Sequence, residues 1–92
     1  MTRDEAETVA LTVLGWLAGE EEIMPVFLGA SGLDRETLAA RATDPDLLVS
    51  VLEFVTMDDR WVLSCAGATG LKPEAPMQAH AILSGAARTH WT

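Results

Sequence analysis

The feature that most constrains the fold is the helical spacing of apolar residues between Thr43 and Gly70. Asp44 can cap a helix and Pro45 suits its first position, where a missing N–H costs nothing. One face then collects the apolar residues Leu47, Leu48, Val51, Leu52, Phe54 and Val55. The pattern stops at residues 57–60 and resumes with Trp61, Val62, Cys65, Ala68 and Thr69. We therefore predict two helices that form an antiparallel hairpin at the centre of the fold.

The first helix is predicted between Thr2 and Gly19. Thr2 and Glu5 have the spacing of a capping box, and a stripe follows that consists of Ala6, Val9, Ala10, Val13, Leu14 and Leu17. Leu11 and Trp16 widen the apolar arc to roughly 220°, more than one packing face requires. Either this is a central helix contacted from two sides, or Leu11 and Trp16 meet another chain. These two residues are the candidate partner-binding residues.

Two short helices are expected before the hairpin. Glu20, Glu21 and Glu22 suit the first turn of a helix that begins at Glu21 or Glu22 and ends at Ser31-Gly32. Pro25 must lie in its first turn, and its inner residues are Ile23, Met24, Phe27 and Leu28. The next helix is capped by Asp34, with a hydrophobic staple of Leu33 and Leu38.

The last helix is predicted to begin at Pro73 and to end at Ser84-Gly85. Its inner face would hold Met77, Ala81 and one of Ile82 or Ser84. This gives one domain over residues 1–85 and a flexible tail over residues 86–92. The predicted fold class is all-α, a compact irregular (orthogonal) bundle of five to six short helices around the central hairpin.

The composition of the chain argues against several classes of function. The chain has 92 residues and a formal net charge of −8, and its six basic residues are isolated from one another, which argues against nucleic-acid binding. No apolar run approaches the 18 to 20 or so residues that cross a bilayer, so no membrane partner is expected. Acidic residues stand where a secretory leader would be basic, which favours a cytoplasmic protein. The single Cys65 lies in an apolar stripe, as a buried inert thiol does.

Catalytic and metal chemistry find no support in the sequence. His80 and His90 are ten residues apart with no thiol or carboxylate in ligand spacing, so both are interpreted as solvent-facing and no metal or cofactor is expected. Asp58, beside Asp59 and Arg60, is explained as a helix cap with Met57 and Val62 as its staple. We therefore expect no enzyme.

Two functions remain open. The first is an acidic helical module that binds another protein or a second copy of itself through apolar residues left outside the core, which are Leu11, Trp16, Val49, Met57 and Leu63. The alternative is a carrier that holds a small ligand in an apolar pocket between helices, with Trp and Met side chains as its lining.

Several phrases of the sequence resemble a small bacterial family known only as a domain of unknown function and found mainly in alphaproteobacteria. The most specific is F-L-x-x-[ST]-G-L-D, at Phe27 to Asp34, followed by R-x-x-x-D-P, at Arg41 to Pro45. The resemblance covers about Ala10 to Pro76 and implies a compact helical domain. It carries over no catalytic or ligand residues. Cys65, Thr69 and Pro25 depart from the family pattern and suggest looser packing.

Overall fold

The computed structural model describes residues 1–88, and these residues form six α-helices and no strand. The helices are α1 (Arg3–Ala18), α2 (Met24–Ser31), α3 (Arg35–Ala40), α4 (Pro45–Thr56), α5 (Asp59–Thr69) and α6 (Ala75–Arg88). The predicted all-α class is confirmed.

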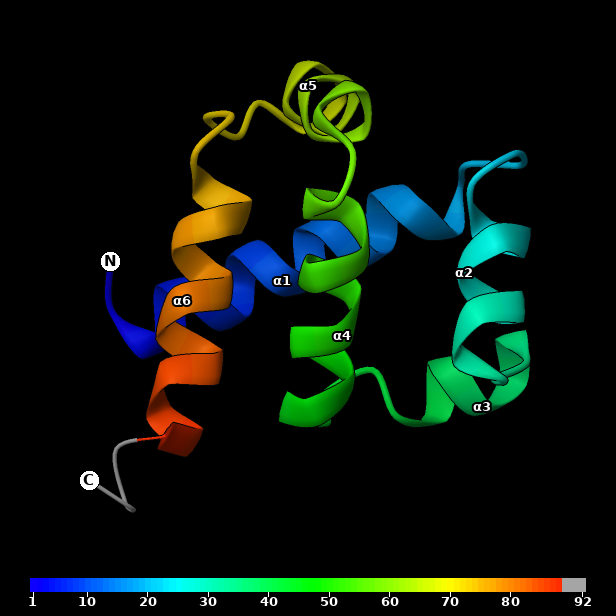
Figure 1. Cartoon of the computed structure of the whole chain (residues 1–92), viewed down its shortest axis with the longest axis horizontal. Helices are drawn as coiled ribbons and strands as arrows, with labels where there is room; N and C mark the ends of the chain where they lie inside the picture. The colour runs from blue at the N-terminus through cyan, green and yellow to red at the C-terminus, as the bar shows by residue number, and fades with distance from the viewer. Residues whose placement is uncertain (89–92) are drawn as a thin grey trace.

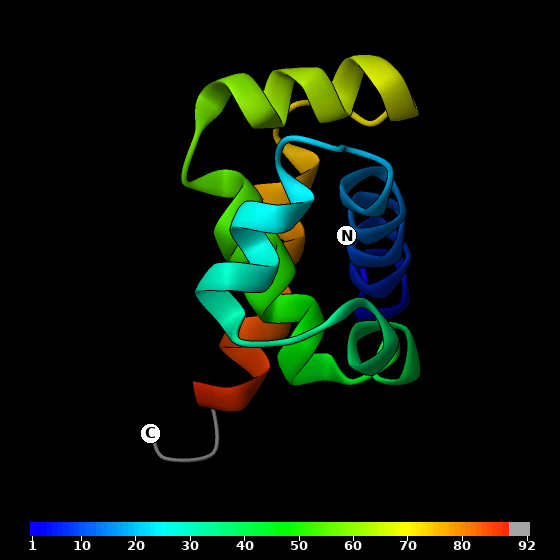
Figure 2. The same cartoon turned by 90° about the vertical axis from the view of Figure 1, so that its right-hand side faces the viewer.

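Three helices form a row that the first helix crosses. α6, α4 and α2 lie next to one another in Figure 1, and α1 passes behind α6 and α4 and ends beside α2. The view in Figure 2 shows α1 set apart on that side, with α5 lying across the top and α3 near the bottom. α1 packs most extensively against α6 and α4, and it also contacts α5. The core therefore lies between α1 and the row of helices.

The predicted position of the hairpin at the centre is wrong. α5 runs across the top of α4 instead of folding back along it (Figure 2). Of its apolar residues only Cys65 is buried, while Trp61 and Val62 are half-buried and Ala68 is exposed. Three residues of α5 thus reach the core, whereas α1 buries six. The helix with the wider apolar face takes the central place because it removes more apolar surface from water.

The predicted ends of α1 are confirmed. The Thr2 hydroxyl accepts a hydrogen bond from the Glu5 N–H at 3.1 Å, and the Glu5 carboxylate accepts one from the Thr2 N–H at 3.0 Å. Gly19 follows the last residue of the helix. All six residues of the predicted stripe are buried: Ala6, Val9, Ala10, Val13, Leu14 and Leu17.

The predicted start of α2 is wrong by two to three residues. The Met24 N–H donates to the Glu20 carbonyl at 2.9 Å, so the three glutamates form a turn before the helix and not its first turn. Pro25 explains the shift. In a helix from Glu21 it would lie too deep and remove a backbone hydrogen bond, whereas in α2 it occupies the first turn, as expected. Met24 and Phe27 are buried, and α2 ends at Gly32 as predicted.

α6 differs from the prediction at both ends. It begins at Ala75, which leaves Pro76 and not Pro73 in the first turn. Its inner face consists of Ala75, Pro76, Ala79 and Leu83, whereas Met77 and Ala81 are exposed. The helix continues through Ser84 and Gly85 to Arg88, into the segment expected to be a tail. The remainder of that segment, with His90, lies outside the described residues.

Candidate functional site

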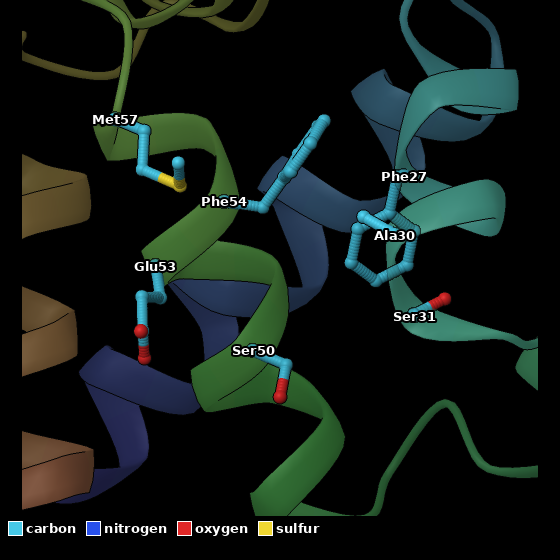
Figure 3. Close-up of a pocket in the computed structure, with 7 residues that line it drawn as sticks. All are labelled: Phe27, Ala30, Ser31, Ser50, Glu53, Phe54 and Met57. Carbon is cyan, nitrogen blue, oxygen red and sulfur yellow. The ribbon is translucent and has the colours of Figure 1, made fainter.

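A groove opens between the C-terminal parts of α2 and α4. Its lining comes from both helices and the residue that follows α4: Phe27, Ala30, Ser31, Ser50, Glu53, Phe54 and Met57. Figure 3 shows the two phenylalanines on opposite walls, with Met57 above them and the two serines below. The volume of this recess, which we call the Met57 recess, is about 230 Å³.

The walls of the Met57 recess are aromatic and fixed. The rings of Phe27 and Phe54 meet edge to face with centroids 5.2 Å apart. On its other side Phe54 stacks on Trp61, with centroids 4.8 Å apart. Phe54 was predicted to be buried but is only half-buried, because it lies at the margin of the apolar face of α4, between the core and the groove. Two aromatic contacts hold a ring that still has a face toward solvent.

Met57 is the most exposed large apolar residue of this recess. Its exposed fraction is 76%, so the predicted staple between Met57 and Val62 does not form. Met57 caps the C-terminus of α4 and its side chain lines the recess, as Figure 3 shows. Val26, one turn before Ala30 on α2, is 52% exposed. A flexible thioether on an exposed rim can adapt to partners of different shape.

A second recess continues the groove toward the segments that flank α3. It is lined by Ser31, Leu33, Arg41, Asp46, Leu47 and Ser50, and its volume is about 220 Å³. Ser31 and Ser50 line both recesses, so the two are continuous. We call the second one the Leu47 recess and the whole the α2–α4 groove. Leu33 and Leu47 supply its apolar part.

The charges along the α2–α4 groove are mainly acidic. Among the residues that the structure describes, Glu53 is the one charged residue that lines the Met57 recess, and its side chain is 67% exposed. In the Leu47 recess the Arg41 guanidinium donates to the Asp44 carboxylate at 2.8 and 3.2 Å, and this ion pair neutralises the charge of Arg41. The negative charge of Asp46 is then left in the lining of this recess. An approaching cation is therefore favoured over an anion.

His80 corrects a prediction. It was expected to face solvent, but its side chain is 24% exposed, and its Nε2 atom is buried with no hydrogen-bond partner. The Oε2 atom of Glu53 lies 3.7 Å from this nitrogen. The packing of α6 against α4 places the two residues together, which the spacing of histidines in the sequence could not indicate.

The three predicted capping aspartates cap their helices as expected. Asp34 accepts a hydrogen bond from the Thr37 N–H at 2.7 Å, which lowers the pKa of its carboxyl group. The pKa values of Asp44 and Asp58 are lowered mainly by hydrogen bonds from Arg41 and Arg60, and also by backbone N–H groups. These two arginines were not assigned a role from the sequence.

Cys65 is buried as predicted. Its exposed fraction is 0%, and burial raises the pKa of its thiol. A thiol that is protonated and inaccessible is a poor nucleophile. Among the described residues, no three His, Cys, Asp or Glu side chains lie together as metal ligands would. Within the same residues, no helix has the length and apolar character to span a bilayer.

Leu11 and Trp16, the predicted partner-binding residues, do not line the α2–α4 groove. Leu11 is 41% exposed on α1. Trp16 is half-buried and packs against the core. The structure places α1 against α6, α4 and α5, which accounts for much of its wide apolar arc. Partner binding by these two residues stays a prediction.

Of the residues that line the Met57 recess, the sequence singled out Met57 alone, as an apolar residue left outside the core, although one signal for the others exists. Ser50, Glu53, Phe54 and Met57 follow the spacing of one helical face, adjacent to the buried stripe of α4. That face contains two apolar and two polar residues, so its periodicity does not separate a groove wall from an ordinary exposed face.

Comparison with known proteins gives one result. No curated protein and no solved structure matches this chain. Residues 3–86 match the family described as "Protein of unknown function (DUF3572)". The match covers all of α1 to α5 and most of α6. The chain is therefore a member of the DUF3572 family of proteins of unknown function.

Proposed function

We propose that this protein is a small interaction module, without catalytic activity of its own, that binds another protein in the α2–α4 groove. The observation that carries the proposal is the apolar Met57 recess, which has fixed aromatic walls and an exposed Met57 at its rim. Single exposed apolar residues are ordinary on a protein surface, but apolar side chains gathered in a groove typify interaction sites.

The shape of the groove supports a protein partner more than a small ligand. Pockets that enclose small ligands usually have volumes of about 300 to 1,000 Å³ and bury most of the ligand. The Met57 recess holds about 230 Å³ and the continuous Leu47 recess about 220 Å³, so the combined volume would admit a small ligand, but both recesses are open to solvent and would leave much of it exposed. An elongated groove between two helices suits a peptide segment that binds along it. The carrier function predicted as an alternative has less support.

We also propose the cellular compartment and the host organism of this protein. A protonated, buried Cys65 as the single cysteine suits a reducing compartment, and we place the protein in the cytoplasm. The family resemblance seen in the sequence points to an alphaproteobacterial host. The test is therefore best done inside such a cell.

Photocrosslinking in the host tests the proposal. A photoreactive phenylalanine at Ala30, on the rim of the Met57 recess, is compared with the same residue at Ala81, an exposed alanine of α6 that lines neither recess. We expect discrete crosslinked protein bands from position 30 that Met57→Asp removes. Equal crosslinking from positions 30 and 81, or bands that persist in Met57→Asp, would contradict a partner in this groove.

A further inference from the structure

We infer that the partner segment is a basic amphipathic helix, with two apolar anchors about two turns apart and a Lys or Arg beside the anchor that enters the Met57 recess. This inference rests on the proposed function and adds the chemistry of the partner. Three observations carry it: the spacing of the two recesses, the charge of their lining, and the net charge of the chain.

The spacing of the recesses matches a helix. Leu47 lines one recess and Phe54 the other, and both lie on α4, seven residues apart. At 1.5 Å per residue this separation is about 10 Å. A partner helix that lies along α4 repeats the same distance between its residues i and i+7. An extended strand covers it in about three residues, and then every second side chain points away from the groove.

The floor between the recesses is formed by Ser31 and Ser50, whose hydroxyl groups make hydrogen bonds within their own helices. The Ser50 hydroxyl donates to the Asp46 carbonyl at 3.1 Å, and the Ser31 hydroxyl donates to the Leu28 carbonyl at 3.4 Å. These serines offer no free donor that would demand a specific partner atom. They therefore suit small side chains of the partner between its two anchors, as a close-packed helix interface requires.

The charge of the groove selects a basic partner. Glu53 stands beside Phe54 at the wall of the Met57 recess and carries the recess's one formal charge. Figure 3 shows its carboxylate at the outer edge of the recess, on the side of α4 that faces away from α2, and its Oε2 atom lies 3.7 Å from the Nε2 atom of His80. Asp46 extends the acidic character into the Leu47 recess, where Arg41 is already paired with Asp44. A Lys or Arg that flanks the anchor in the Met57 recess reaches Glu53.

The net charge of the chain disfavours a second copy as the occupant. Two chains of this kind each carry a formal charge of −8, so self-association brings like charges together. A basic helix instead gains attraction from the whole surface, which also accelerates its association. The occupant we commit to is therefore a different chain.

Selection from a displayed library of helical peptides tests this inference. The library varies two positions seven residues apart and the positions that flank them, and binders are kept when Met57→Gln or Ala30→Gln, which add no charge, abolishes their binding. Met57 and Ala30 are exposed, so both variants can be shown to fold by circular dichroism. We expect the selected peptides to carry large apolar residues at both varied positions and Lys or Arg at one flank.

Charge reversal at Glu53 supplies the matched control. Glu53→Lys and Glu74→Lys change the net charge equally, but Glu74 lines neither recess. A selected basic peptide should bind Glu53→Lys about fivefold or more weakly than the parent protein, because a solvent-exposed ion pair contributes modestly to the binding free energy. Its affinity for Glu74→Lys should stay within about twofold of its affinity for the parent protein. Repeated selection on Glu53→Lys should replace the basic flank with Asp or Glu.

The outcomes separate this inference from the proposed function. Selected binders with apolar anchors but no basic preference, or extended peptides without helical spacing, overturn the inferred chemistry while the crosslink at position 30 still supports a groove that binds protein. If no groove-dependent peptide is selected, the inference is overturned as well. A doubled mass in solution together with self-crosslinking at position 30 identifies a second copy and rejects the basic helix. Absence of any crosslinked band from position 30 in a protein that keeps Met57 rejects the proposed function.

Discussion

Leu52 has no exposed surface, and its neighbours on the same face of α4, Leu48, Val51 and Val55, are buried with it. Leu52→Ala should lower the free energy of unfolding by about 2 to 5 kcal/mol, because it removes buried methyl groups and leaves a cavity. Leu63→Ala is the control, since Leu63 is 61% exposed and should change stability by less than about 0.5 kcal/mol. Chemical denaturation of both variants measures the difference. Equal losses would contradict the assigned face of α4.

The capping aspartates make stability depend on pH. The pKa values of Asp34, Asp44 and Asp58 are lower in the folded protein than in the unfolded chain, where they are about 3.9. Their stabilisation is therefore present above the unfolded pKa and is lost as pH falls through the folded pKa. Relief of repulsion among the excess acids opposes this loss.

A triple variant isolates the contribution of these caps. Asp34→Asn, Asp44→Asn and Asp58→Asn together keep capping side chains but remove the titrating groups. Between about pH 6 and pH 3, the unfolding free energy of the parent protein should fall more steeply than that of the triple variant. Denaturant titrations at several pH values measure both slopes. Parallel curves would mean that the caps do not govern acid stability.

Residue patterns in the sequence predicted backbone caps well but side-chain partners poorly. A cap is a local interaction over two or three residues, so Thr2, Asp34 and Asp58 could be assigned from spacing alone. The position of His80 beside Glu53 depends on how α6 packs on α4, and no local spacing encodes that. Phe54 was taken as core for the same reason: periodicity gives the side of a helix but not where the core ends.

In the helices, replacement of two glycines by alanine should change stability in opposite directions. Gly70 ends α5 with φ of 80°, a left-handed conformation that other residues adopt at a cost, whereas Gly15 lies exposed inside α1 with no neighbouring atom where a Cβ would project. Gly70→Ala should therefore destabilise the protein by about 1 kcal/mol, and Gly15→Ala should stabilise it by up to about 1 kcal/mol. Thermal unfolding of the two variants gives the signs. The same sign for both would contradict the assigned helix ends.

The two helix starts that were predicted wrongly have one cause. Both α2 and α6 contain a proline near their start, and each begins so that this proline lies in its first turn. For α2 the acidic residues before Pro25 suggested an earlier start, and for α6 a second proline, Pro73, did so. A missing N–H is a stronger local constraint than a favourable charge near a helix end, which contributes about 0.3 to 1 kcal/mol.

For the whole molecule, the sequence indicated the class of fold but not its arrangement. The period of the apolar residues and the short connections sufficed for an all-α bundle. Which helix becomes central depends on the comparison of apolar faces between helices, and here α1 contacts α4, α5 and α6 while α5 lies across the top. The α2–α4 groove follows from that arrangement, because α1 passes behind α4 and ends beside α2 (Figure 1), and the recess between α2 and α4 stays open to solvent.

Substitution of Trp16 tests whether the wide apolar arc of α1 packs in the core or binds a partner. Its ring packs against the core, so Trp16→Ala should destabilise the monomer by about 3 kcal/mol and leave its mass in solution unchanged. Leu11→Ser is the matched change on the exposed side of α1 and should alter stability by less than about 1 kcal/mol. Denaturation and sedimentation of both variants give the two quantities.

A different result for Trp16→Ala would support the interaction surface predicted on α1. In that case stability would change little, while crosslinking to partners or self-association would weaken by about 2 kcal/mol or more, as it does when a binding anchor is removed. Comparison with Met57→Asp then separates the two surfaces: partners lost in Met57→Asp but kept in Trp16→Ala bind the α2–α4 groove. Because α1 is covered by three helices and the Met57 recess is open to solvent, we expect partner binding to be lost in Met57→Asp and kept in Trp16→Ala.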